Sequence, residues 1–154
     1  AGHAARLARF ISTRLVRNDG LFKAVARGRQ IEGAELEDYA YIVAGLLDYA
    51  EAAKDNMAKQ LASRLAHQAW NRFFSSRGWR REANPLLKTI RPEAILPDGA
   101  TPSPSAMLIA ASLRLDDAGL NTMARQALSW QSMAMSHDPF AFATHIRVYQ
   151  QGIN

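Results

Sequence analysis

Six segments of this chain carry apolar residues at the three- and four-residue spacing of an α-helix, and this periodicity constrains the fold more than any other feature. Only weak alternation occurs elsewhere, in 18–34 and 77–103, where a few short strand pieces are the most that is expected. The sequence therefore predicts an all-α domain. The predicted helices cover residues 4–17, 35–53, 56–76, 104–117, 120–135 and 138–151.

The predicted helices differ in how much of their circumference is apolar. Helices 35–53 and 104–117 are apolar nearly all round, as buried helices are, whereas 4–17, 56–76 and 120–135 have a polar face. Long connections precede the two buried helices, and short ones follow them. This pattern is typical of stacked αα-hairpins with an inner and an outer layer. All the long loops, and the N-termini of the buried helices, are then expected on one rim.

Length and composition indicate one domain with a core of its own, since the chain has 154 residues of which 48% are hydrophobic. No run of about 18 apolar residues occurs, so no membrane span is expected. The chain has no cysteine, which excludes disulfides and thiolate chemistry within it. A reducing compartment is compatible with this, and we expect a cytoplasmic protein. The chain lacks an initial Met and stops in or just after a helical pattern, so a fragment of a longer protein is expected.

The net charge of +5 is concentrated near the N-terminus. A basic stripe can attract phosphate, but no nucleic-acid motif accompanies this one and aromatic residues are not interleaved with it. A solvated outer helix face is therefore the favoured interpretation, and no nucleic-acid partner is expected. Asp19 alone opposes the seven basic residues of this stretch, which are Arg6, Arg9, Arg14, Arg17, Lys23, Arg27 and Arg29.

Three stretches together resemble one protein family: "ELEDYAYIVAGLLDYAEA", then "FF…GWRR", then "IRPEAILPDGATPSPSAMLIAASLRL". They are similar to the C-terminal part of a family of uncharacterised thioredoxin-domain proteins, to which bacterial YyaL and the animal spermatogenesis-associated thioredoxin-like protein belong. The resemblance covers roughly residues 28–151. The motifs L-E-D-Y-A and D-G-A-T-P-S occur in the family's order and at a plausible separation.

The resemblance implies a fold and a set of partners. Members of the family carry a thioredoxin-like domain followed by an (α/α)6 toroid, related to N-acylglucosamine 2-epimerase and the six-hairpin glycosidases. The resemblance makes residues 1–154 a single segment of about three hairpins, half of a toroid. The expected partners are the remaining hairpins and the thioredoxin-like domain of the parent chain, and a carbohydrate at the long-loop rim. The exposed inner layer also suggests a homodimer through helices 35–53 and 104–117.

The candidate site residues come from the two motifs, because related toroidal enzymes use rim carboxylates as acids and bases on sugars. The resemblance implies catalytic roles for Glu37, Asp38 and Asp98. It implies ligand binding by Tyr39, Thr101 and Ser103, and Trp79 in its long loop is the best candidate for stacking on a sugar ring. The family's second motif commonly continues Gly-Asn-Ser, whereas this chain reads Pro104-Ser105-Ala106. The missing Asn removes an amide that could hydrogen-bond a polar ligand.

Each of these residues also has a structural interpretation. Acidic residues in the first turn of a helix are stabilised by its dipole, and hydrogen bonds to loop amides explain Asp38 about as well as a ligand does. Asp98-Gly99 is a common turn pair, and tryptophan is more often core than platform. His67 and His145 have no partner at metal spacing, so no metal and no cofactor are expected.

Two functions therefore remain open from the sequence. One is a helical scaffold that supports or presents another domain. The other is half of a carbohydrate cleft, with epimerase-like or glycosidase-like acid and base chemistry. The chain lacks a phosphate-binding glycine loop, a G-x-S-x-G elbow and the strand–helix alternation of a dinucleotide fold.

Overall fold

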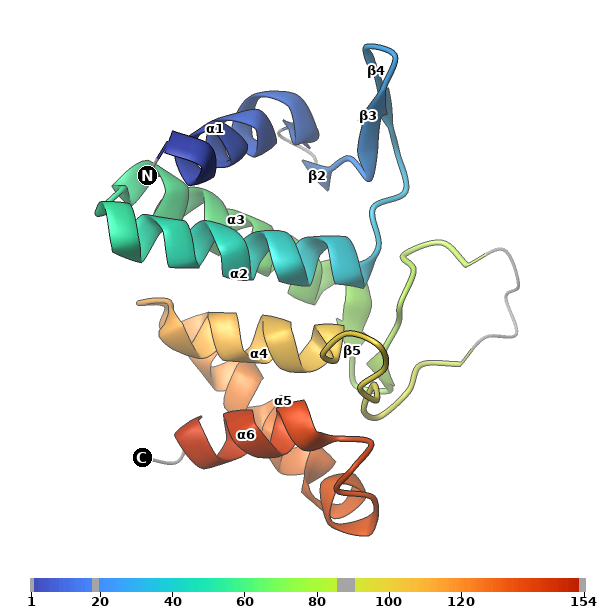
Figure 1. The fold of residues 1–154 in the computed structure, drawn as a ribbon. Helices are drawn as coiled ribbons and strands as arrows, with labels where there is room; N and C mark the ends of the chain where they lie inside the picture. The colour runs from blue at the N-terminus through green and yellow to red at the C-terminus, as the bar shows by residue number, and fades with distance from the viewer. Residues whose placement is uncertain (1, 18–19, 86–90, 153–154) are drawn as a thin grey trace.

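The computed structural model describes residues 2–17, 20–85 and 91–152, and this part of the chain is mostly helical (Figure 1). The all-α prediction is confirmed at this level. The helices are α1 (Gly2–Phe10), α2 (Leu36–Ala53), α3 (Asn56–Phe73), α4 (Pro104–Arg114), α5 (Ala118–His137) and α6 (Ala143–Gly152). A π-helical stretch, η1 (Ile11–Leu15), continues α1. None of the described helices is long and apolar enough to cross a membrane.

The helices form two rows. α2, α4 and α6 lie side by side at the front of Figure 1, with α3 and α5 behind them and α1 across the top. α2 packs against both α3 and α4, and α4 packs against both α5 and α6. The N-terminal ends of α2, α4 and α6 all point to the same side of the molecule. This arrangement places the loops that precede these three helices on one side.

Side-chain caps explain where several helices begin. The Glu35 side chain accepts a hydrogen bond from the Asp38 amide, and the Asp38 side chain accepts one from the Glu35 amide, which is a capping box at the start of α2. Asp55 accepts hydrogen bonds from two amides of the first turn of α3. Asp117 accepts one from the Leu120 amide at the start of α5.

The strands are short, as the sequence predicts, and form three separate antiparallel pairs within the described residues, but β1 and β5 lie at the ends of segments that were predicted to be helical. β1 (Val16–Arg17) pairs with β2 (Gly20–Leu21), β3 (Ala24–Ala26) with β4 (Arg29–Ile31), and β5 (Phe74–Ser75) with β6 (Gly78–Trp79). Arg27 and Gly28 join β3 to β4 with positive φ at both residues, which is the backbone of a tight hairpin turn.

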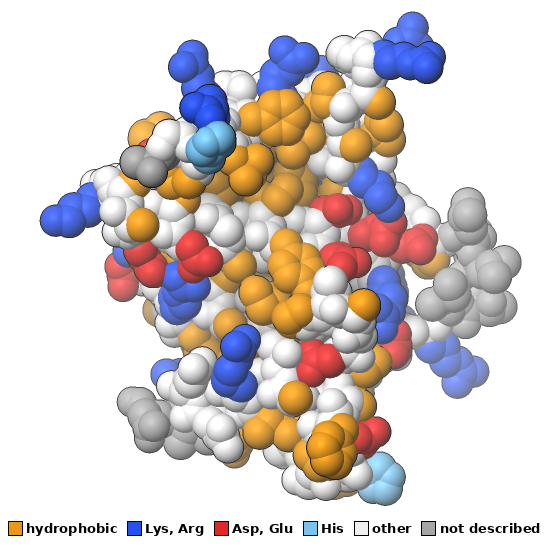
Figure 2. Space-filling model, in the orientation of Figure 1, with side chains coloured by type: hydrophobic (Ala, Val, Ile, Leu, Met, Phe, Trp, Pro, Cys, Tyr) orange, Lys and Arg blue, Asp and Glu red, His pale blue; other side chains and the backbone are white. Residues whose placement is uncertain are grey.

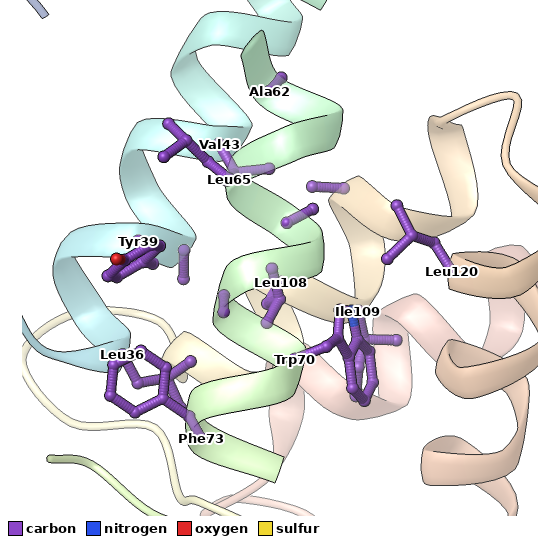
Figure 3. Packing of buried hydrophobic residues seen from close by; sticks show 14 of the residues in the cluster. Leu36, Tyr39, Val43, Ala62, Leu65, Trp70, Phe73, Leu108, Ile109 and Leu120 are labelled. Carbon is purple, nitrogen blue, oxygen red and sulfur yellow. The ribbon is translucent and has the colours of Figure 1, made fainter. Parts of the chain in front are cut away.

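The core lies between the two rows of helices (Figure 3). Leu36, Tyr39 and Val43 of α2 face Leu65 and Phe73 of α3, and side chains of α4 and α5 continue the same cluster. Trp70 of α3 also contacts Trp79 of β6, with ring centroids 4.9 Å apart. The core therefore joins the helices to the long connection between α3 and α4.

Several predicted boundaries need correction. The first helix is regular only to Phe10, because a π-helical stretch follows it. The fifth helix begins before the predicted residue 120, since Asp117 is its N-cap and α5 starts at Ala118. The last helix begins later than the predicted residue 138: residues 139–142 form a turn, and α6 begins at Ala143.

One face of α2 is less buried than the sequence predicts. Tyr41, Ile42 and Tyr49 remain partly exposed, and Gly45 is exposed. α3, which was expected to be half-exposed, buries Leu61, Leu65 and Trp70 as fully as α2 buries its own core residues. The distinction between a buried and a half-exposed helix is therefore weaker for this pair than the composition indicates.

Candidate functional site

The predicted site residues other than Trp79 lie where α2 and α4 begin, on the side shared by the helix N-termini. A hollow of about 250 Å³ is present there, lined by residues that include Glu37, Arg81, Asp98 and Thr101. Figure 2 shows acidic side chains gathered at this side, where α2 begins. The two motifs are thus brought together, although 60 residues separate Asp38 from Asp98 in the sequence.

Asp98 connects the beginnings of two helices. Its Oδ1 accepts a hydrogen bond from the Ser103 amide at 2.7 Å, directly before α4, and its Oδ2 accepts one from the Thr144 amide at 2.8 Å, in the first turn of α6. Partial burial opposes ionisation of Asp98, but the amides of Thr144 and Ser103 hold its pKa below the usual value. Both carboxylate oxygens therefore already have structural partners.

The side chains of Asp38 and Glu35 also accept hydrogen bonds from backbone amides. Asp38 Oδ2 accepts from the Glu35 amide at 2.8 Å as half of the capping box. Glu35 in turn forms an ion pair with Lys23 in the segment between β2 and β3. Helix capping accounts for both side chains, and Asp38 does not line the hollow.

Glu37 is the one predicted acidic residue that is exposed at the hollow. Its Oε1 accepts a hydrogen bond from the Thr101 hydroxyl at 3.3 Å, a long contact between exposed groups. Glu37 and Thr101 are therefore placed to meet a solute at the surface.

Tyr39 and Ser103 are buried and have internal partners. The Tyr39 hydroxyl accepts a hydrogen bond from the Leu21 amide at 3.0 Å, and its ring packs edge-on against Phe73. Ser103 caps α4 by accepting from the Ala106 amide. Neither side chain is exposed, so neither reaches a ligand in this conformation.

The expectation that Trp79 offers a stacking surface does not fit its position. The side chain is fully buried, and its ring centroid lies 4.9 Å from that of Trp70 and 4.6 Å from that of Phe74. Glu93 pairs with Trp79 through two backbone hydrogen bonds, and this pairing holds part of the long connection beside β6. A ring buried in this way has no face open to a sugar.

A buried chain of polar groups that joins the start of α4 to α6 was not predicted. Ser103 Oγ lies 3.0 Å from Ser105 Oγ, which lies 3.1 Å from His145 Nε2 of α6. All three side chains are fully buried. The sequence held a weak signal, because His145 falls among apolar positions of the last helix.

This serine–histidine contact is not arranged for nucleophilic catalysis. His145 Nδ1 has no hydrogen-bond partner within the described part of the chain, so no carboxylate orients the ring as a catalytic triad requires. Burial lowers the pKa of His145 to about 4, against the opposing charge of Asp98. The contact instead links α4 to α6 with a neutral imidazole.

Across residues 2–17, 20–85 and 91–152, no three His, Asp or Glu side chains are grouped so that they could hold a metal ion. No known protein family matches the chain, and no curated protein matches it.

Proposed function

We propose that this chain is a helical scaffold, a toroid-like array whose rim carboxylates fix the ends of helices. The observation that carries the proposal is Asp98, which accepts one backbone amide from the start of α4 and another from the start of α6. A carboxylate used in this way holds two helices in register, and its ionised form is the one that accepts both hydrogen bonds.

Three further features support a scaffold. Asp38 is committed to the capping box of α2, Trp79 is buried, and the Ser105–His145 contact joins α4 to α6. The proposed parent is a thioredoxin-domain protein in which this array is about half of an (α/α)6 ring of stacked hairpins. The parallel front row of α2, α4 and α6, each followed or preceded by a helix behind it, is compatible with that ring (Figure 1).

The hollow between Glu37 and Thr101 favours a second candidate, part of a carbohydrate-binding cleft. Two exposed polar groups line it together with Arg81 and the Asp98-Gly99 turn, and hydroxyl-rich ligands are bound by such groups. The scaffold is preferred because an acid–base pair at the hollow would have to join Glu37 to Asp98 or Glu35, and both of these carboxylates already accept backbone amides.

An NMR titration distinguishes the two candidates. Backbone amide shifts of Gly99 and Thr101 are followed while glucose, N-acetylglucosamine and a glucose disaccharide are added to millimolar concentration. The scaffold predicts no saturable shift. Saturable shifts that disappear in Glu37→Gln but persist in Asp116→Asn, a matched change of an exposed carboxylate away from the hollow, would establish the cleft instead.

A further inference from the structure

A second hollow, with a mainly apolar surface, lies between α1 and α2. It has a volume of about 340 Å³ and is lined by alanine, leucine, isoleucine, phenylalanine, tyrosine and glycine side chains, with no charged residue among them. Leu7 and Phe10 on the α1 side are 59% and 43% exposed, and Tyr49 on the α2 side is 37% exposed. Large apolar side chains grouped in an open groove on a protein surface typically mark an interaction site.

Gly45 forms part of the floor of this groove and is an independent indication of a partner. It lies in the middle of α2, where glycine is less favourable than alanine by roughly 1 kcal/mol. An added Cβ there would meet no atom within 4 Å, so packing within this chain does not require glycine. A glycine in the middle of a helix lets another backbone approach closely.

The charge around the groove is one-sided. Residues 2–17, which form α1, η1 and β1, include Arg6, Arg9, Arg14 and Arg17 and no acidic residue. Figure 2 shows Lys and Arg side chains along the upper edge of this face, above the hydrophobic side chains over α1 and α2. On the α2 side, two exposed carboxylates, Asp48 and Glu51, share one ion-pair partner, Arg114, so the positive charge lies on the α1 side alone. The groove is therefore apolar at its floor and basic along its α1 side.

We propose that this groove binds an amphipathic helix that carries acidic residues along the edge facing α1. The lining residues on α1 and η1 run from Ala4 to Leu15, about three turns or 16 Å, which matches the length of a short helix with anchors at i, i+4 and i+7. The helix crosses α2 at Gly45, and its acidic edge faces Arg6 and Arg14.

Two other occupants fit the observations less well. A second copy related by a twofold axis brings its own arginine-rich α1 to the same place, so like charges meet across the interface. An anionic lipid surface satisfies the charge but is flat on this scale, whereas the apolar residues line a concave groove between two helices. This inference rests on the proposed scaffold function, because the bound helix would belong to the protein that the scaffold presents or supports.

The probe is a helix-stabilised peptide of about four turns, with leucine at i, i+4 and i+7 and glutamate on one flank, labelled for fluorescence anisotropy. A matched peptide carries lysine in place of each glutamate. We expect saturable binding of the acidic peptide and at least about tenfold weaker binding of the lysine peptide. Failure of both peptides to bind at up to millimolar protein, or equal binding of the two, would overturn the proposal.

Substitutions at Gly45 test the position of the crossing. Gly45→Glu and the uncharged Gly45→Gln should each weaken the acidic peptide by at least about tenfold, because both fill the floor of the groove. Neither should lower the melting temperature, since the site is open space on a helix. Gln126→Glu, on the exposed side of α5, is the control and should leave the affinity unchanged. Wild-type affinity in Gly45→Gln would contradict a helix crossing at this residue.

Paired charge variants test the basic side. Arg6→Gln with Arg14→Gln should weaken the acidic peptide about tenfold and reduce its salt dependence, whereas Arg27→Gln with Arg29→Gln, on the β3–β4 hairpin, removes the same charge and should not.

Two companion measurements identify the alternative occupants of the groove. A sedimenting dimer that Gly45→Gln abolishes would replace the helix with a second copy, and Gly45-dependent binding to phosphatidylserine vesicles would replace it with a membrane. The NMR titration of the rim tests the scaffold separately, because no rim residue lines this groove.

Discussion

Gly78→Ala is expected to destabilise the protein strongly, because the added methyl group has no room. Gly78 has φ of +109°, a conformation that residues with a side chain rarely adopt. A Cβ at this position would lie 2.3 Å from the carbonyl oxygen of Glu93 and 2.7 Å from its carbonyl carbon. The obstacle is backbone, held by two hydrogen bonds between Trp79 and Glu93, so it cannot rotate away as a side chain would.

The magnitude follows from two contributions. The backbone conformation costs about 1–3 kcal/mol for a residue with a Cβ, and forcing a methyl group into a packed site costs about 1–3 kcal/mol more. The expected loss is therefore about 2–6 kcal/mol, a large part of the roughly 5–15 kcal/mol typical of a domain. Displacing the segment around Glu93 also exposes Trp79, which is otherwise fully buried.

Urea unfolding followed by circular dichroism and by tryptophan fluorescence measures this loss. Gly45→Ala is the matched control, because the same methyl group meets open space in mid-helix and should stabilise the protein by about 0.5–1 kcal/mol. A Gly78→Ala variant within about 0.5 kcal/mol of wild type would refute the close approach of residues 78 and 93.

Truncation of helix side chains and acidification give two further predictions. Leu46→Ala and Leu108→Ala truncate side chains that are nearly or fully buried, and each should lower the free energy of unfolding by about 2–5 kcal/mol in urea melts. Arg64→Ala truncates an exposed side chain and should stay within about 0.5 kcal/mol of wild type. Equal losses for the three variants would count against the core described above. Because the pKa of His145 falls from 6.5 when unfolded to about 4 when folded, the unfolded state binds more protons between these values and stability decreases as the pH falls through them. Going from pH 7 to pH 5 should therefore cost about 2 kcal/mol in wild type and much less in His145→Gln, and parallel pH profiles for the two proteins would show that His145 is not held neutral.

The helices were predictable because their signals are local. Apolar periodicity located α2, α3, α4 and α5 to within a few residues, and the acidic residues around Glu35 are the capping box that first-turn carboxylates commonly form. The start of α6 was missed because Pro139 suits a first helical turn, whereas here Asp138 accepts a hydrogen bond from the Ala141 amide and holds a turn instead.

The candidate site was less predictable because its contacts join distant parts of the chain. Asp98 reaches Thr144 across 46 residues, and Ser105 reaches His145 across 40. The burial of Trp79 depends on the pairing of Glu93 beside it. Glu93 lies in the long connection between α3 and α4, whose sequence has no helical or strand periodicity. The sequence could place Asp98 and Trp79 near the rim, but only the packed chain distinguishes a carboxylate facing solvent from one facing two amides.

The unfolding free energy of Asp98→Ala tests the scaffold most directly. Truncation leaves the Ser103 and Thr144 amides without their acceptor, and each unsatisfied amide costs about 1–3 kcal/mol when fully buried. Because both hydrogen bonds are only partly buried, a loss in the lower part of the summed range, about 2–4 kcal/mol, is expected. Asp116→Ala, which removes an exposed carboxylate paired with Lys59, should leave stability unchanged within error. If Asp98→Ala is as stable as wild type, Asp98 does not hold α4 and α6 together, and its carboxylate is free for another role.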